Sequence, residues 1–303
     1  MAAESLDQLV TEGRGEKAAE YELKSTLELV QGMNAEDATV AGVVGRAASD
    51  LADLIDAVVE RLAGGGRLIY VGAGTSGRLA ALDAAECEPT FSTEPGQVLA
   101  LVAGADLGSS PEQDAAEDDA DAGERAVRDL EVSQKDAVIA LSASGRTPYV
   151  LGAVGAAAEA GALAAAVVSS PGSELARLAD HEIAVVVGSE FVAGSTRLKA
   201  GTAQKLVLNT ISTVSMIRLG KTYGDLMVDV AGTNEKLRAR ARRTVLEATG
   251  ATQEEVDAAL ESCGGNAKVA IVSLLAGVDA EAARARLDEA GGSIRDAISE
   301  VSA

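Results

Sequence analysis

The chain has 303 residues, and 47% of them are hydrophobic although only 2% are aromatic, so its core must consist of Ala, Val, Leu and Ile. This length suits one large domain or two ordinary ones. The net charge of −21 argues against nucleic-acid binding, because contacts to phosphate need clustered Lys and Arg.

The composition also argues against a membrane protein and against two common kinds of catalytic site. No uncharged apolar run reaches the roughly 18–20 residues that a membrane helix needs, and the N-terminus has no targeting pattern. His181 is the single histidine, and Cys87 and Cys263 are far apart, which argues against a zinc site or a serine–histidine triad. We therefore expect a soluble cytoplasmic protein. Its acidic surface fits either a salty cytoplasm or an ordinary acidic protein.

The first 55 residues are predicted to be mainly helical. Ser25 and Glu28 form a capping-box pattern, which predicts a helix over 25–33 that restarts at 34–37. Apolar residues then recur at helical spacing up to Gly64, which predicts one long helix leading into the first strand.

Short apolar strands alternate with helical segments across residues 56–232. The strands are expected at 67–71, 98–103, 137–141, 163–168 and 183–187. This alternation predicts an α/β fold with a doubly wound parallel sheet and helices on both faces. Ligands of such sheets bind at the carboxyl ends of the strands, where the strand order reverses.

A glycine-rich turn follows the strand at 67–71. Residues 72–78 contain three glycines with the spacing of a dinucleotide fingerprint, and Thr75 and Ser76 add hydroxyl donors where a helix begins. Backbone N–H groups and the helix dipole favour an anion there. A dinucleotide enzyme also needs an acidic residue just after the second strand, and Asp106 comes several residues late.

A second loop of the same kind follows the strand at 137–141. Ser142, Ser144 and Thr147 surround Gly145 and precede a helix. Two such loops suit a phosphate monoester on a small molecule. Ordinary strand-to-helix turns, in which Ser and Thr serve as caps, are the alternative interpretation.

Two carboxylates lie near these loops in the sequence. Glu86 is expected at the end of the helix that begins at the glycine turn, and Glu117 within an acidic helix over 110–130. By residue type alone, an ordinary helix-end carboxylate and one charge of a solvated run are the favoured interpretations of Glu86 and Glu117.

The composition changes after Val230. A basic helix is expected at 233–249, followed by short helices at 252–262, 266–275 and 279–290 that are separated by glycine turns. This pattern predicts a small helical bundle without a long internal repeat. The arginines of the basic helix are interpreted as solvated or as facing a partner subunit.

Along nearly its whole length the chain resembles the N-acetylmuramic acid 6-phosphate etherases. The segments that carry the resemblance are 25–28, 34–37, 72–78, 82–87, 142–149, 194–205, Asn209 and 234–237. The resemblance implies a sugar-isomerase (SIS) domain with a flavodoxin-like sheet, a small C-terminal helical subdomain, a homodimer, and no metal or cofactor. We therefore expect an N-terminal helical segment at 1–55, the SIS domain at 56–232 and the helical subdomain at 233–303.

The resemblance also implies the reaction and its residues. The expected lyase cleaves the lactyl ether of N-acetylmuramic acid 6-phosphate, giving N-acetylglucosamine 6-phosphate and D-lactate, with Glu86 and Glu117 as catalytic acid/base residues. The implied substrate contacts are Gly74, Thr75, Ser76, Gly77, Ser142, Ser144, Gly145, Thr147, Arg197 and Lys199. The last two are expected to complete the site, from the same subunit or from its partner.

Two other functions stay open. A non-catalytic phosphosugar-binding regulator has the same fold but needs no pair of glutamates. An aldose–ketose isomerase would form a ketose without lactate. The chain also departs from the family at Glu88, where proline is usual, and this extra carboxylate beside Glu86 could alter the substrate or the pKa of the site.

Overall fold

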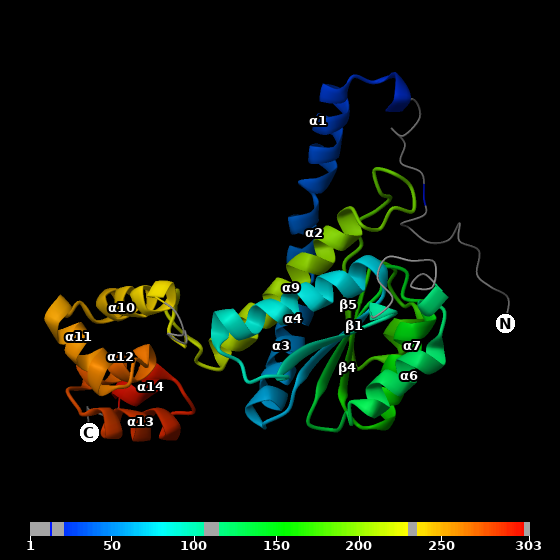
Figure 1. Ribbon diagram of the computed structural model, residues 1–303. Helices are drawn as coiled ribbons and strands as arrows, with labels where there is room; N and C mark the ends of the chain where they lie inside the picture. The colour runs from blue at the N-terminus through cyan, green and yellow to red at the C-terminus, as the bar shows by residue number, and fades with distance from the viewer. Residues whose placement is uncertain (1–12, 14–20, 106–114, 230–234, 300–303) are drawn as a thin grey trace. The chain divides into compact units, whose positions relative to one another are not determined.

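The computed structural model describes residues 13, 21–105, 115–229 and 235–299 (Figure 1). Asp106 and most of the linker before residue 235 lie outside this part of the chain. By their contacts, the residues form two compact units, Met1–Ala85 with Gly96–Ile211 and Glu86–Pro95 with Ser212–Ala303. The three-part division at residues 55 and 232 stays a prediction.

The first unit contains a five-stranded sheet. Its strands are β1 (Leu68–Gly72), β2 (Val98–Val102), β3 (Ala137–Leu141), β4 (Leu163–Val168) and β5 (His181–Ala184). All neighbouring pairs are parallel in the order β2-β1-β3-β4-β5, so the predicted doubly wound sheet is confirmed. The strand order reverses at β1, between β2 and β3, which is where a sheet of this order binds ligands.

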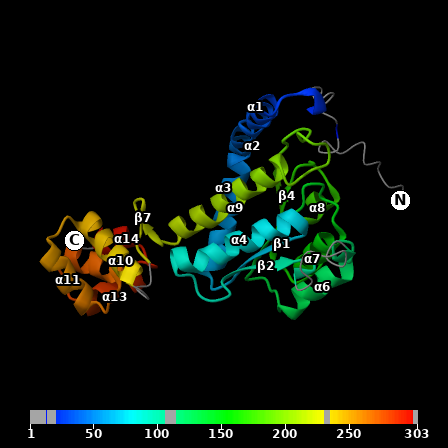
Figure 2. The same cartoon turned by 45° about the horizontal axis from the view of Figure 1, so that its top comes forward.

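Helices cover both faces of this sheet. The helices α6 (Ala120–Asp129), α7 (Pro148–Glu159) and α8 (Glu174–Leu178) lie on one face. Figures 1 and 2 show α3 (Ala48–Ala63), α4 (Gly74–Phe91) and α9 (Lys199–Arg218) on the other. Among the described residues, no helix is both long and apolar enough to cross a membrane.

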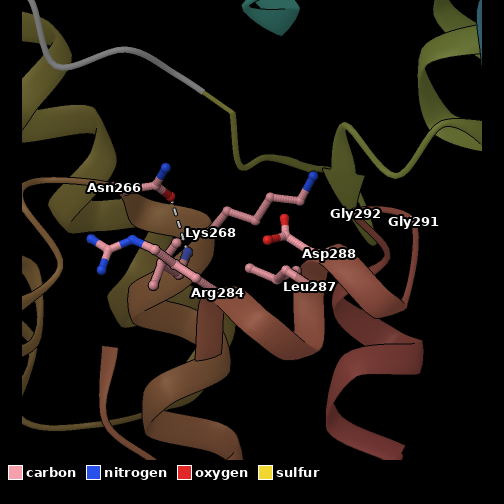
Figure 3. Close-up of a pocket in the computed structure, with 8 residues that line it drawn as sticks. Asn266, Lys268, Arg284, Leu287, Asp288, Gly291 and Gly292 are labelled. Atoms are coloured by element: carbon pink, nitrogen blue, oxygen red, sulfur yellow. Dashed lines mark hydrogen bonds between the residues drawn. The ribbon is translucent and has the colours of Figure 1, made fainter. Parts of the chain in front are cut away.

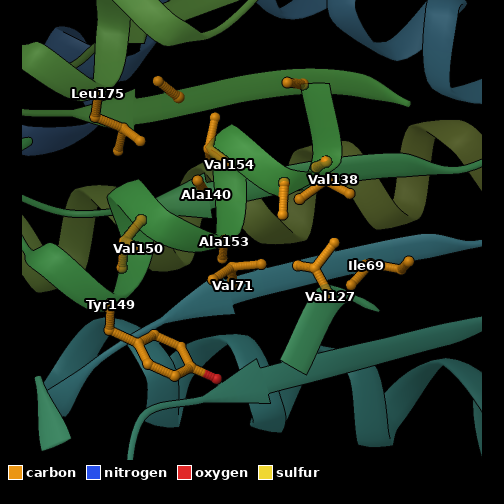
Figure 4. Close-up of a cluster of buried hydrophobic side chains, with 14 of the residues drawn as sticks. Ile69, Val71, Val127, Val138, Ala140, Tyr149, Val150, Ala153, Val154 and Leu175 are labelled. Carbon is orange, nitrogen blue, oxygen red and sulfur yellow. The ribbon is translucent and has the colours of Figure 1, made fainter. Parts of the chain in front are cut away.

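The main core lies between the sheet and α7, and it consists of small aliphatic side chains (Figure 4). Val71, Val138 and Ala140 of the strands pack against Val150 and Val154 of α7, all of them buried. Each fully buried valine of this kind stabilises the fold by about 1.5–3 kcal/mol. Closely packed Val and Ala side chains thus fill the core in place of aromatic residues.

The N-terminal helices differ in part from the prediction. The capping box is confirmed, because the backbone N–H of Glu28 donates to Ser25 Oγ and that of Ser25 to Glu28 Oε2. The predicted restart at residue 34 and the single long helix are wrong, since the segments are α1 (Thr26–Asp37), α2 (Val40–Arg46) and α3. The Thr39 hydroxyl donates to the Glu36 carbonyl at 2.7 Å, a local bond that competes with helix continuation.

The second unit contains a helical bundle. Its helices are α10 (Glu235–Thr249), α11 (Gln253–Ser262), α12 (Ala267–Ala276), α13 (Ala280–Glu289) and α14 (Ile294–Ser299). The predicted bundle is confirmed, but α14 and a short hairpin of β6 (Thr222–Tyr223) and β7 (Leu226–Met227) were not predicted.

The bundle is built from a repeat of 27 residues, although no long repeat was expected. The helix pair α11–α12 and the pair α13–α14 begin at equivalent positions, and each pair is joined by a Gly-Gly turn at 264–265 or 291–292. In both turns the second glycine N–H donates to a leucine carbonyl five residues earlier. The repeat is difficult to recognise in the sequence because few positions besides the glycines are identical.

A partly buried ion pair joins the amino ends of β1 and β3. The Arg67 guanidinium donates to both carboxylate oxygens of Asp136, at 3.0 and 2.8 Å, and the backbone N–H of Ser133 donates at 2.9 Å. Asp136 is 2% exposed. Burial alone would raise the pKa of Asp136, but the hydrogen bonds from Arg67 and Ser133 outweigh it and hold this pKa below its usual value.

Replacing Asp136 by Asn should therefore lower the free energy of unfolding by about 3 kcal/mol at pH 7, because it leaves Arg67 without its charged partner. The lowered pKa stabilises the folded state above about pH 4, and this contribution is lost as the pH falls through the folded-state value. Urea titrations should show that the difference in the free energy of unfolding between wild type and Asp136→Asn becomes smaller below pH 4. Asp118→Asn, which makes the same change at an exposed position, is the control and should change the free energy of unfolding little. A difference between wild type and Asp136→Asn that persists unchanged at pH 2.5 would contradict this account.

Candidate active site

A cavity of about 380 Å³ opens at the carboxyl ends of β1 and β3. It is lined by Ala73, Gly74, Thr75, Ser76, Arg78, Glu117, Leu141, Ser142, Ala143, Ser144, Thr147, Gly194 and Thr196. All these residues belong to the first unit. Its size falls within the range of about 300–1,000 Å³ that is usual for small-molecule sites.

The start of α4 forms one wall of the cavity. The helix begins at Gly74 directly after β1, so Thr75 and Ser76 lie in its first turn. The first N–H groups of a helix have no partner within it, and together with the helix dipole they favour an anion. The donors on which the predicted anion site depends thus lie at the junction between β1 and α4.

The second hydroxyl loop forms the opposite wall and is internally hydrogen-bonded. Ser142 Oγ lies 2.9 Å from Thr147 Oγ1, and the backbone N–H of Gly145 donates to Ser142 Oγ at 3.0 Å. Thr147 precedes α7 but makes no side-chain cap with it, so the start of this second helix also faces the cavity. Residues of both predicted loops thus line the same cavity.

Glu117 reaches the cavity from a turn and not, as predicted, from within a helix. The helix begins later because the Asp119 carboxylate accepts from the backbone N–H of Ala122 and caps α6 there. The backbone N–H of Tyr149, in the first turn of α7, donates to the Glu117 carbonyl at 3.0 Å. This bond fixes residue 117 beside the second loop.

Gly74 leaves room for the Glu117 carboxylate. A Cβ atom at residue 74 would lie 2.7 Å from Glu117 Oε1, and Gly74 has a φ of +51°, which side chains rarely adopt. The absence of a side chain therefore lets a carboxylate lie against the start of α4, next to both hydroxyl loops.

The sequence relates the chain closely to proteins of known name. It is 57% identical to N-acetylmuramic acid 6-phosphate etherase from Rubrobacter xylanophilus over 98% of both chains. The chain belongs to this etherase family. It is also 50% identical to the etherase of the same name from Streptomyces avermitilis, over 97% of this chain and 94% of that one.

Family models and a solved structure agree on the fold of this chain. Residues 120–213 match the SIS domain, and residues 50–158 match the glucokinase regulatory protein N-terminal SIS domain. A phosphoheptose isomerase from Francisella tularensis aligns with a TM-score of 0.53 at 17% identity, over 64% of this chain and all of that one. The SIS fold expected from the resemblance is confirmed.

Six residues that line the cavity were not among the predicted site residues, namely the apolar Ala73, Leu141 and Ala143, and Arg78, Gly194 and Thr196. Arg78 lies on α4 four positions after Gly74, and Gly194 and Thr196 belong to the loop before α9. Helical periodicity was a usable signal for Arg78, because positions i and i+4 share one face of a helix. Gly194 and Thr196 lie in segment 194–205, which carries the family resemblance and was a usable signal for them.

Several predicted residues do not line the cavity. Gly77 and Gly145 are buried and shape the two turns, whereas Arg197 is exposed. Lys199 is 4% exposed and pairs with Glu36 of α1 at 2.7 Å. This ion pair directs the Lys199 ammonium to the N-terminal helices.

Glu86 lies in the middle of α4 and not, as predicted, at its end. The helix continues through Pro89 to Phe91, and the Glu86 side chain is exposed. Residue 86 comes 12 positions after Gly74 on the same helix, which corresponds to about 18 Å along its axis. Glu86 is not among the residues that line the cavity.

A second cavity, of about 430 Å³, lies in the bundle of the second unit (Figure 3). Its cations already have internal partners, because Lys268 Nζ pairs with Asp229 at 3.1 Å and Arg284 donates to the Cys263 carbonyl at 3.1 Å. Among the described residues, no three His, Cys, Asp or Glu side chains are grouped as a metal ion would require.

The close packing of Gly145 gives a test of the second loop. Gly145 has a φ of +66°, and a Cβ atom there would lie 2.1 Å from Ser173 Oγ, the cap of α8. Gly172 has a similar φ of +64° but open space around it. We expect Gly172→Ala to lower the free energy of unfolding by about 1–2 kcal/mol from backbone strain alone.

Gly145→Ala should lower the free energy of unfolding by about 1 kcal/mol more than Gly172→Ala does, because it also displaces the Ser173 cap of α8. Urea unfolding of the two variants, monitored by circular dichroism, measures the difference. Equal losses would show that the approach of Ser173 to residue 145 does not hold the loop.

Proposed function

We propose that this protein cleaves the lactyl ether of N-acetylmuramic acid 6-phosphate, giving N-acetylglucosamine 6-phosphate and D-lactate. The observation that carries the proposal is a carboxylate, Glu117, held in a hydroxyl-lined cavity of a chain that is 57% identical to an etherase of that name. Although one family model is that of a regulatory protein, the full-length relatives bear the name of an enzyme, which favours catalysis over regulation.

The cavity has the groups that a phosphorylated sugar needs. The N-terminus of α4 and the hydroxyls of Thr75, Ser144 and Thr147 supply hydrogen-bond donors for phosphoryl and sugar oxygens. Arg78 adds a positive charge at the wall formed by α4. We assign the remaining contacts to Gly74, Ser76 and Ser142.

The reaction follows from the acidity of the C2 proton. In the open-chain sugar this proton lies next to the aldehyde, so a carboxylate can remove it, and the lactyl oxygen then leaves from C3 with a proton from an acid. Water adds to the resulting double bond, with its oxygen at C3 and a proton at C2. Glu117 and Glu86 are the proposed acid/base residues, and which step each serves is left open.

The lining of the cavity supports a site that two subunits share. Glu117 lines this cavity and Glu86 does not, so the lining contains only one of the two proposed acid/base residues. We propose a homodimer in which Glu86 of the partner subunit faces the cavity that holds Glu117. Arg197, which is exposed, is a further candidate to act across this interface.

The N-terminal helix also supports the homodimer. Leu23, Leu27 and Val30 are 76%, 65% and 60% exposed, and α1 has no buried residue. Figure 1 shows α1 extending away from the sheet. A second copy of the chain would cover this apolar stripe. We further propose that the enzyme acts in the cytoplasm without a metal or cofactor, and the net charge of −21 argues against a nucleic-acid partner.

Replacing Glu117 by Gln should slow the release of D-lactate by about 10²–10⁴-fold, because the amide can neither accept nor donate the proton that the reaction requires of this residue. A lactate dehydrogenase assay with N-acetylmuramic acid 6-phosphate measures the rate. Asp118→Asn, which removes an exposed carboxylate from the next position, is the matched control and should keep wild-type activity. Unchanged lactate release from Glu117→Gln would overturn its catalytic role.

Mixing two inactive variants tests the shared site. If Glu86 acts on the cavity of the partner subunit, a dimer of one Glu86→Gln chain and one Glu117→Gln chain has one intact site and one doubly altered site. After subunit exchange at equal concentrations, about a quarter of all sites should be intact, so about a quarter of the wild-type activity should return. Each variant carried through the same exchange alone is the control. A mixture as inactive as its components would contradict the shared site.

A further inference from the structure

Gln204 of α9 contacts Ser76, a residue that lines the cavity, without lining the cavity itself. Its side chain is 1% exposed, and its Oε1 accepts a hydrogen bond of 2.8 Å from Ser76 Oγ. Ser76 itself lines the cavity, whereas Gln204 does not. The amide therefore acts on the site only through the Ser76 hydroxyl.

The other end of the same amide has no partner. Gln204 Nε2 is buried and makes no hydrogen bond with any residue that the structure describes. Its neighbours on α9, Ala203 and Val207, are fully buried apolar residues, so packing alone would favour an apolar side chain here. Buried donors without partners are rare in folded proteins, and each one requires an explanation.

The Ser76 hydroxyl has only one proton to donate. While this proton is donated to Gln204 Oε1, Ser76 Oγ offers only lone pairs to the cavity. The oxygens of an ionised phosphoryl group are acceptors, so they cannot bond to Ser76 in this state. The observed arrangement thus holds Ser76 in an orientation that does not bind an anion.

Rotation of the amide by 180° reverses this arrangement. Nε2 then donates to Ser76 Oγ, and the hydroxyl proton is released toward the cavity. We propose that Gln204 is a positioning residue whose amide rotates when the phosphorylated sugar binds, so that Ser76 donates to a phosphoryl oxygen. This inference rests on the proposed function, and it assigns Ser76 to the phosphoryl group of the ligand.

Binding and not turnover is the appropriate measurement. The probe is N-acetylglucosamine 6-phosphate, titrated calorimetrically into the full-length protein, with N-acetylglucosamine as the probe that lacks phosphate. Gln204→Met keeps the size and removes both amide groups, and it should weaken binding of the phosphorylated sugar about tenfold. The weak affinity for the unphosphorylated sugar should stay unchanged.

Gln204→Glu is the second variant. Its carboxylate can only accept, so it retains the Ser76 proton and should weaken binding of the phosphorylated sugar more than Gln204→Met does. Ser215→Ala is the matched control, since Ser215 Oγ is also a buried group of α9 without a partner among the described residues. It should leave the affinity unchanged.

A double-mutant cycle separates positioning from a structural role. If Gln204 acts through Ser76, the Ser76→Ala/Gln204→Met double variant should bind no more weakly than Ser76→Ala alone. Additive losses, or a Gln204→Met affinity equal to that of wild type, would overturn the role of Gln204 and leave the proposed function intact. A wild-type protein that does not bind the phosphorylated sugar would overturn both.

Discussion

The approach of the Glu117 carboxylate to Gly74, where a side chain would stand, is the constraint on which the site depends. A Cβ atom at residue 74 would lie 2.7 Å from Glu117 Oε1, so any other residue would displace the carboxylate or the start of α4. Because α4 begins at this residue, the same glycine serves two purposes. It turns the chain out of β1, and it lets an acidic group approach donors that otherwise favour a bound anion.

The sheet explains why these groups meet. β1 and β3 are neighbours and run parallel, so the loops after them lie at one edge, and the Arg67–Asp136 ion pair joins their opposite ends. Two more contacts then complete the cavity: Tyr149 holds the Glu117 backbone from α7, and Gln204 holds Ser76 from α9. The hydroxyl loops are therefore positioned by buried groups that do not themselves line the cavity.

The strands, the two hydroxyl loops and the bundle could be predicted because each depends on a local pattern of apolar residues, glycines and caps. The break at Thr39 and the turn that holds Glu117 could not, since each depends on which polar group captures a nearby backbone atom. Gln204 was missed for another reason, because it acts from a helix more than a hundred residues away in sequence from Ser76. Arg78 was missed although helical periodicity could have placed it on the same face as Gly74.

A crystal structure of the protein with N-acetylglucosamine 6-phosphate tests the central claim most directly. The account predicts the phosphoryl group in the cavity between the starts of α4 and α7, with C2 of the sugar about 3–3.5 Å from a carboxylate oxygen of Glu117. A ligand held instead in the cavity beside Lys268 and Arg284, with the hydroxyl loops empty, would contradict it.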